Sequence, residues 1–361
     1  MGSLGRRPAR VKRTLARVAR GLSGIVLPVL MTECALRMSP APKHADVTFN
    51  ATDNSAQGMY SPDPELLHKP TAGFTGTVDS LGYSVDIRVN QHSLRGPEVG
   101  EKAGERWLAA GDSFTFAAQV NEPQSFVGLL NTPDREVLNA GADGYGTWQA
   151  LRRYEALDDE LALDGVLLVF FVGNDLHDNS YFHHALKQPR PDDVGPKAKS
   201  SWLQKNSVLW ARWQIRMRAD ALKDPNNPER QRWTNELRLF MADDQGARQA
   251  LLPSSEQALR ELRDAVRARG DKLLVAVAPP AFQVQPERVE ATFALVGLDP
   301  EAAKVDAPSD AIHSVLRRLT VDSCDLVQPL REQAEGAYFE YDGHWTPHGH
   351  AIVADTINGC F

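Results

Sequence analysis

The sequence predicts an α/β protein whose main domain has a three-layer α/β/α, flavodoxin-like arrangement around a parallel five-stranded sheet. Two observations predict this fold. Short apolar segments of strand length alternate with amphipathic helical patterns from about residue 105 onward. In addition, residues 166–172 are apolar at every position, which is typical of a central parallel strand covered by helices on both faces.

The alternation defines the expected elements in order. The expected strands are residues 107–110, 136–139, 166–172, 272–277 and 321–327. The clearest helical patterns are residues 147–161, 255–269, 310–319 and 347–357. Residues 176–252 interrupt the alternation, so we expect a helical insertion there. Its tryptophans are expected mainly to pack within the insertion, with a substrate cleft or a membrane surface as alternative contacts: Trp202, Trp210, Trp213 and Trp233.

Composition and charge limit the class of protein. The chain has 361 residues, 42% of them hydrophobic, and a formal net charge of −7, which is unlike a disordered or fibrous protein. Residues 1–20 are nevertheless strongly basic, and they lead directly into an apolar stretch at residues 21–32. An arm that binds nucleic acid rarely continues in this way, so no nucleic-acid partner is expected.

A charged segment followed by an apolar one is typical of an export signal. The apolar stretch is shorter than the roughly 20 residues that cross a bilayer as a helix, and an uncleaved signal anchor or a cleaved signal peptide fits residues 1–38. A buried or amphipathic helix is the alternative. We therefore expect a periplasmic or extracellular protein with membrane contact through this segment. Lipid modification of Cys34 is a weaker alternative, because Glu33 stands where a small residue is expected.

The sequence between this segment and the main domain changes character twice. Residues 39–63 are polar, contain proline and have no sustained period, so they predict a linker. Residues 64–104 hold short alternating runs punctuated by glycine, which predict a small β lead-in. The domain at residues 105–361 contains Cys324 and Cys360, which an exported chain is expected to pair in a disulfide; two unrelated buried thiols are the alternative.

Three short motifs each follow an expected strand. In the first, Gly-Asp-Ser-Phe, a tight strand-to-helix turn places Ser113 at the carboxyl edge of the sheet, although a helix N-cap would explain the serine as well. The glycine-rich residues 139–147 let the backbone approach a ligand, but their order is not a dinucleotide fingerprint, so no cofactor is expected. In the third motif, Asn174 offers an amide donor that does not titrate. Each motif alone could be an ordinary turn.

A fourth motif lies near the C-terminus, at residues 342–350. Asp342 is close enough in sequence to fix the tautomer of His344 and to stabilise its charged form. Together with His348 and His350 these two residues could alternatively hold a metal. A helix from residue 347 onward would turn His350 away from His344, so no metal site is expected.

In this order the four motifs resemble the sequence blocks of the SGNH (GDSL-like) hydrolase superfamily. The resemblance covers residues 106–357 and is to the membrane-anchored bacterial members of the superfamily. The resemblance implies the SGNH hydrolase fold, with Ser113 as nucleophile, His344 as general base and Asp342 as its carboxylate partner. In the usual last block the aspartate and histidine are three residues apart, whereas here only Gly343 separates them. The Asp-x-His-Trp-Thr pattern is similar to the alginate O-acetyltransferase branch.

The resemblance also implies an oxyanion hole, formed by the backbone N–H of Ser113 together with Gly144 and Asn174. We choose Gly144 over Gly141 because the glycine of the family lies about five residues beyond the strand-end asparagine, here Asn139.

Acyl transfer through a serine ester follows from these roles. The favoured activity is an esterase that hydrolyses acetyl or other short O-acyl esters, so the expected partner is an acylated small molecule, lipid or polysaccharide of the cell envelope. A polysaccharide O-acetyltransferase with the same residues is the first alternative, and a non-catalytic binding module is the second. The lack of a Gly-x-Ser-x-Gly motif argues against an ordinary α/β-hydrolase.

Overall fold

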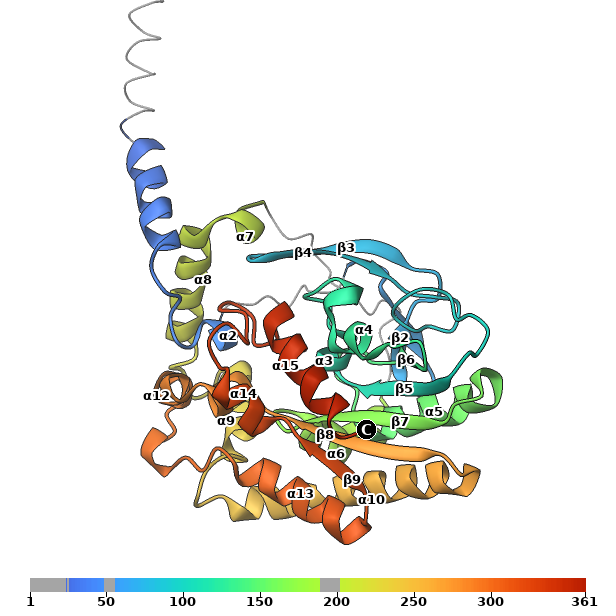
Figure 1. Cartoon of the computed structure of the whole chain (residues 1–361). Coiled ribbons are helices and arrows are strands. Elements are labelled where there is room, and N and C mark those ends of the chain that lie inside the picture. Colours follow the sequence, from blue (N-terminus) through green and yellow to red (C-terminus); the bar gives the residue numbers. More distant parts are fainter. Residues whose placement is uncertain (1–23, 25, 49–55, 189–201) are drawn as a thin grey trace, which may run out of the picture.

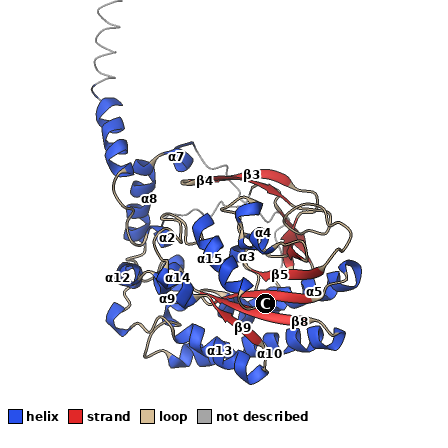
Figure 2. Ribbon diagram, viewed as in Figure 1, coloured by secondary structure: helices blue, strands red, loops and turns tan. Residues whose placement is uncertain are grey.

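A five-stranded parallel sheet lies at the centre of the molecule (Figure 1). The structure is a computed structural model, and it describes residues 24, 26–48, 56–188 and 202–361. The strand order is β6-β5-β7-β8-β9, and all neighbouring pairs are parallel. The strands are β5 (Glu105–Gly111), β6 (Arg135–Asn139), β7 (Gly165–Phe171), β8 (Lys272–Ala278) and β9 (Asp322–Asp325). Helices cover both faces of the sheet (Figure 2), so the predicted three-layer α/β fold is confirmed.

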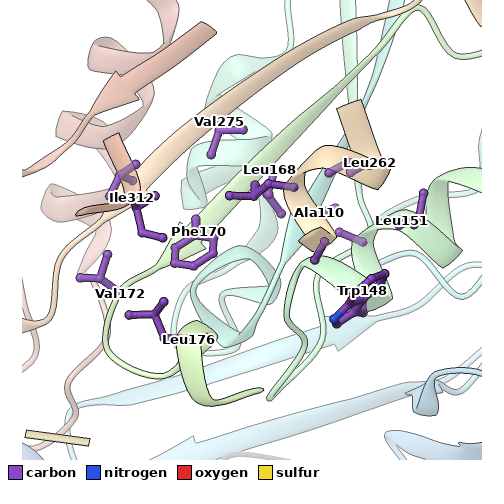
Figure 3. Packing of buried hydrophobic residues seen from close by; sticks show 14 of the residues in the cluster. Ala110, Trp148, Leu151, Leu168, Phe170, Val172, Leu176, Leu262, Val275 and Ile312 are labelled. Atoms are coloured by element: carbon purple, nitrogen blue, oxygen red, sulfur yellow. The ribbon is translucent and has the colours of Figure 1, made fainter. Parts of the chain in front are cut away.

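Alternate side chains of the strands point into two separate cores, because successive residues of a strand face opposite sides. One face carries Leu168 and Phe170 of β7, which pack with Trp148, Leu262 and Ile312 (Figure 3). The helices on this face are α5 (Thr147–Leu161), α6 (Asp175–Ala185), α10 (Gln245–Arg269) and α13 (Ala307–Leu319).

The opposite face of β7 carries Leu167 and Val169. Its core also includes Phe114, Trp345 and Ile357. The helices on this face are α3 (Ser113–Phe116), α4 (Phe126–Leu130), α14 (Val327–Glu332) and α15 (Pro347–Asn358). The two short helices α3 and α4 lie between β5 and β6 in the sequence, and α15 completes the layer from the far end of the chain.

The described parts of the expected insertion, residues 176–188 and 202–252, are mainly helical. The insertion contains most of α6 and the first residues of α10, and between them α7 (Trp202–Asn206), α8 (Val208–Ala221) and α9 (Pro228–Arg238). Its tryptophans divide into two groups: Trp202 and Trp213 are 72% and 51% exposed, whereas Trp210 and Trp233 are partly buried. Further helices of the structure are α2 (Ala45–Thr48), α11 (Ala281–Val284), α12 (Val289–Leu295) and the 3₁₀ helices η1 (Glu122–Gln124), η2 (Pro286–Arg288) and η3 (Pro300–Ala302).

Two antiparallel hairpins precede the sheet, and we call them the lead-in hairpins. They consist of β1 (Tyr60–Asp63) with β2 (Leu67–Pro70), and of β3 (Thr75–Ser80) with β4 (Tyr83–Arg88). Val78, Val85 and Ile87 pack in one cluster with Phe116 of α3 and with Tyr145. The lead-in hairpins are therefore anchored on the segment that follows β5.

Residues 39–63, expected as a linker, include ordered elements. The helix α2 lies in this segment, and so does β1. Asp46 forms an ion pair with Arg288 at 3.1 Å, and both side chains are less than a tenth exposed. Polar composition predicted a linker here, but the pairing partner of Asp46 lies more than two hundred residues away in the sequence and cannot be seen in a local pattern.

Some element bounds differ from the sequence expectation. α10 begins at Gln245 and runs through Pro253, although proline removes a backbone hydrogen bond inside a helix. The packing of α10 against α5 and α6 keeps the helix continuous there. α13 begins at Ala307, with Pro308 in its first turn, where the missing N–H costs nothing. β9 is only Asp322–Asp325, because the chain turns into α14 at Val327, whose backbone N–H donates to Asp325 Oδ1 at 2.9 Å.

The N-terminal segment is helical over residues 26–37 and carries exposed apolar side chains, including Leu27 and Met31 at 60% and 65% exposure. The whole basic part of the expected export signal, residues 1–20, lies outside the described residues. Within the described part of the chain, no helix has both the length and the apolar character needed to cross a membrane. Cys34 is exposed, and Cys324 and Cys360 form a disulfide that joins β9 to the segment after α15.

Candidate active site

Ser113 begins α3 immediately after β5, in a turn that requires glycine. Gly111 has a φ of +150°, and a Cβ at this position would come within 2.7 Å of the carbonyl oxygen of Val169 on the neighbouring strand. Asp112 caps the helix, since its carboxylate accepts a hydrogen bond from the backbone N–H of Phe114 at 2.9 Å. The turn therefore presents Ser113, which is only partly buried, at the carboxyl edge of the sheet.

His344 lies between Ser113 and Asp342. Its Nε2 is 2.7 Å from Ser113 Oγ, and its Nδ1 is 2.5 Å from Asp342 Oδ1. The same carboxylate oxygen accepts the backbone N–H of His344 at 3.1 Å, so the short spacing through Gly343 forms a tight turn. With the Nδ1 proton donated to Asp342, Nε2 is left to accept the hydroxyl proton of Ser113. The structure thus brings the three residues together in the order serine, histidine, aspartate.

The protonation of this pair is set by burial and by its own charges. Burial lowers the pKa of His344, but the charge of Asp342 and the hydrogen bond to it raise that pKa more, and the net value lies above 6.5. Burial raises the pKa of Asp342, but His344 and the hydroxyl of Tyr83 lower it more, and the net value lies below 3.8. Asp342 is therefore ionised at neutral pH, and its charge favours the protonated form of His344.

The two candidate glycines of the oxyanion hole have different surroundings. Gly141 packs against α3, where a Cβ would lie 2.7 Å from Thr115 Cβ, and its N–H already donates to Asn139 Oδ1 at 3.1 Å. Gly144 has a φ of +69° and open space where a Cβ would stand. No described residue accepts a hydrogen bond from its N–H. The amide of Gly144, rather than that of Gly141, is therefore available to a ligand.

Asn174 follows β7 and occupies the N-cap position of α6. Its side chain makes no capping hydrogen bond, and its Oδ1 is buried without a partner among the described residues. Ser113, Gly144 and Asn174 follow the carboxyl ends of β5, β6 and β7, which are adjacent in the sheet. The side-chain amide of Asn174 is therefore not needed by the helix and is left for a ligand at this edge.

Further buried carboxyl groups adjoin these residues. Burial raises the pKa of Asp112 to about 7 and that of Asp178 to about 8. Burial, followed by the charges of Asp112 and Asp178, also raises the pKa of Asp175 well above its usual range. The raised pKa values favour the neutral form of these carboxyl groups close to Ser113.

His348 and His350 do not join His344. His348 is exposed, and His350 is buried with its Nδ1 accepting the backbone N–H of Phe126 at 3.2 Å. Burial lowers the pKa of His350 to about 3, so this ring is a neutral packing residue. Among the described residues, no group of three histidine, cysteine or acidic side chains could hold a metal ion.

Three residues of the lead-in hairpins reach the site and were not found from the sequence. The hydroxyl of Tyr83 donates to Asp342 Oδ2 at 2.8 Å. His68 Nε2 lies 2.8 Å from the carbonyl oxygen of Asp143, and the hydroxyl of Tyr60 accepts the backbone N–H of Asp143 at 3.1 Å. No spacing or motif indicates these contacts, because each partner lies at least 75 residues away.

One family model matches the chain. Residues 237–359 match the SGNH hydrolase-like domain of the acetyltransferase AlgX. The matched segment includes Asp342 and His344 and begins after Ser113, Gly144 and Asn174. A search of curated proteins found no match.

Several solved structures are distantly similar. A protein of the G-D-S-L family from Desulfitobacterium hafniense is 14% identical with a TM-score of 0.39, covering 72% of this chain and 100% of that one. An extracellular lipase from Streptomyces rimosus is 12% identical with a TM-score of 0.41, with the same coverage of the two chains. An acetylxylan esterase from Geobacillus stearothermophilus is 14% identical with a TM-score of 0.37, covering 72% of this chain and 94% of that one.

The match to the AlgX-type domain supports the resemblance to SGNH hydrolases that the motifs indicated. Together with the serine, imidazole and carboxylate in line, it supports an enzyme that acts on ester bonds, either as a hydrolase or as an acyltransferase.

Proposed function

We propose that the chain is a serine-dependent acyl-transfer enzyme. Its reaction adds an acetyl or other short O-acyl group to a hydroxyl of an envelope glycan or removes it from one. The observation that carries this proposal is the 2.7 Å contact between His344 Nε2 and Ser113 Oγ, with Asp342 behind the imidazole. A serine hydroxyl is a weak nucleophile at neutral pH, and a base at this distance is the usual means of activating it.

The reaction has two balanced halves. Ser113 Oγ attacks the ester carbonyl while its proton moves to His344 Nε2, and the oxyanion is held by the N–H groups of Ser113 and Gly144 and the amide of Asn174. The oxyanion collapses, the ester bond breaks, and His344 protonates the departing alcohol. The second alcohol or water then loses its proton to His344 as it attacks the acyl-Ser113 carbonyl. When this intermediate collapses, the bond between the acyl group and Ser113 Oγ breaks, and His344 returns the proton to Oγ, which restores the free serine and the neutral base.

The acceptor decides between transfer and hydrolysis. The sequence favoured hydrolysis, but the matching family model is that of an acetyltransferase, and this supports a sugar hydroxyl as acceptor. We therefore place acetyl transfer to a polysaccharide first. Hydrolysis is the second candidate, supported by the 21% exposure of the His344 side chain, which lets water reach the base.

The compartment is part of the same proposal. The disulfide between Cys324 and Cys360 supports an oxidising environment outside the cytoplasm, because reducing systems keep cytosolic thiols free. The basic and apolar N-terminal segment supports export with membrane contact, and an envelope polysaccharide is available there as substrate.

A serine-directed fluorophosphonate probe and acetyl tracking test this proposal. The wild-type protein is expected to react with the probe and to move labelled acetyl from an activated ester to a glycan, as followed by mass spectrometry. Ser113→Ala should lose both activities by at least about a thousandfold while its unfolding transition is kept. Ser314→Ala on α13, in the opposite layer, is the matched control and should behave as wild type.

Each outcome separates the candidates. Transfer to glycan above the rate of acetate release supports the acetyltransferase, and the reverse supports the esterase. A protein that binds acetylated glycan but does not react with the probe would be a binding module, and the proposal would be abandoned.

A further inference from the structure

The lead-in hairpins contact the candidate site at two places. β4 supplies Tyr83, whose hydroxyl donates to Asp342, and β2 supplies His68, which contacts the carbonyl oxygen of Asp143. These contacts join residues 259 and 75 positions apart in the sequence. The hairpins that make them are fixed by their own core against Phe116 of α3. They therefore have a rigid base beside Ser113.

Tyr83 holds the oxygen of Asp342 that His344 does not use. Asp342 Oδ1 faces His344 and Oδ2 accepts the tyrosine hydroxyl, so the two contacts fix the plane of the carboxylate. The ring of Tyr83 also packs on Phe339, with centroids 5.2 Å apart, and Phe339 N–H donates to the carbonyl of His344 at 3.0 Å. Tyr83 thus supports the loop that carries both the carboxylate and the base.

His68 acts on the peptide group between Asp143 and Gly144. The carbonyl oxygen of Asp143 and the N–H of Gly144 belong to the same planar unit, and in a trans peptide they point in opposite directions. A hydrogen bond from His68 Nε2 to that oxygen, at 2.8 Å, therefore fixes the direction of the Gly144 N–H. It also polarises the amide, which makes the N–H a stronger donor.

The ring of His68 is itself held in place. It lies 5.2 Å from the ring of Tyr60 and 5.4 Å from that of Tyr145, and the hydroxyl of Tyr145 donates to the His68 carbonyl at 2.5 Å. Burial lowers the pKa of His68, so the ring is neutral at pH 7 and its single proton is on the nitrogen that faces Asp143.

We propose that Tyr83 and His68 are positioning residues of the reaction: Tyr83 orients the Asp342 carboxylate, and His68 orients the Gly144 N–H that receives the oxyanion. This inference rests on the proposed acyl transfer at Ser113. It makes the lead-in hairpins part of the catalytic unit.

Tyr83→Phe tests the first contact, because it removes only the hydroxyl and keeps the ring on Phe339. We expect kcat for acyl transfer to fall about ten- to a hundredfold with KM unchanged, the loss that follows when a hydrogen bond to a charged group is removed. The Nδ1 proton of His344, observed by NMR of ¹⁵N-histidine-labelled protein, should change its chemical shift. Tyr181→Phe, which removes an exposed hydroxyl from α6, is the control and should change neither.

His68→Gln and His68→Leu test the second contact as a pair. The glutamine amide can still donate to the Asp143 carbonyl, whereas leucine cannot. We expect His68→Leu to lower kcat about tenfold or more and His68→Gln to restore most of the loss, with similar unfolding midpoints for the two proteins. A purely structural role would lower stability in both variants and would not separate their kcat values.

Reaction of the wild-type and control proteins with the fluorophosphonate tests acyl transfer at Ser113 separately from the roles of Tyr83 and His68. If wild-type protein and Tyr181→Phe do not react with the fluorophosphonate, both are overturned. If they react and Tyr83→Phe keeps the wild-type kcat and proton shift, Tyr83 does not orient Asp342. Equal kcat values for His68→Gln and His68→Leu would likewise overturn the role of His68.

Discussion

At the carboxyl edge of the sheet, Ser113, Gly144 and Asn174 each come soon after a strand, whereas the lead-in hairpins reach the same site with side chains from elsewhere in the sequence. The edge offers groups that could contact a substrate: a hydroxyl, a backbone N–H and an amide. The hairpins instead contact residues of the site, namely Asp342 and Asp143.

The groups at the sheet edge are therefore assigned to contact with the substrate, and the residues of the lead-in hairpins to the positioning of those groups. A parallel sheet brings the loops after adjacent strands together whatever their exact sequence, so the edge is a general place for a reactive group. Only a specific contact, such as that of Tyr83, can then hold a carboxylate in one plane. Substitutions of residues at the sheet edge should therefore lower activity more than substitutions in the lead-in hairpins.

Removal of a donor at the edge should give the larger effect. Asn174→Ala is expected to lower kcat for acyl transfer about a hundred- to a thousandfold, because an oxyanion donor acts mainly in the transition state. Steady-state kinetics on an activated acetyl ester provide the measurement, with the exposed Asn121→Ala as control. A decrease in kcat smaller than that caused by Tyr83→Phe would contradict the assignment of substrate contact to the sheet edge and of positioning to the hairpins.

The pH dependence of activity tests the proposed role of His344 as the base. His344 must be neutral to accept the Ser113 proton, and its pKa lies above 6.5. Activity should therefore rise with pH, and the acid limb of kcat/KM should have its midpoint above 6.5. His350, whose pKa is lowered to about 3, should leave this limb unaffected when replaced by asparagine. An acid limb centred below 6.5 would contradict the coupling of His344 to Asp342.

The disulfide should have the smallest effect on catalysis. It joins Cys324 on β9 to Cys360 after α15, at an edge of the sheet that contributes no group to the site. Cys324→Ser/Cys360→Ser is expected to lower the free energy of unfolding by about 2 to 4 kcal/mol and to leave kcat nearly unchanged. Urea unfolding of this variant and of Cys34→Ser, the control without a bridge, would measure it. A large decrease in kcat in the fully folded variant would show that β9 also helps to position the residues of the site.

Much of the fold could be predicted because the sheet has simple sequence signals. The uniformly apolar segment at β7 indicated a buried parallel strand, and the helical patterns beside it indicated the covering layers. The edge strand β9 was expected to be longer, since apolar residues flank it on both sides. The order in α2 and the passage of α10 through Pro253 depend on tertiary partners, which a local pattern does not contain.

The site could be predicted in part for the same reason. Ser113, Gly144 and Asn174 follow strands, and Asp342 is next but one to His344, so each had a local signal. Tyr83 and His68 had none, because a tyrosine in an alternating β segment is an ordinary residue until the partner of its hydroxyl is known.

The most direct test of acyl transfer through Ser113 is the identification of a covalent acyl group on this residue. Wild-type protein mixed with an activated acetyl ester, quenched within the first turnover and digested, should carry one acetyl group on the peptide that contains Ser113, as measured by tandem mass spectrometry. Ser113→Ala should carry none, and addition of glycan or water should remove the group from wild type. An acetyl group on another residue with turnover intact, or full turnover by Ser113→Ala, would contradict the central claim.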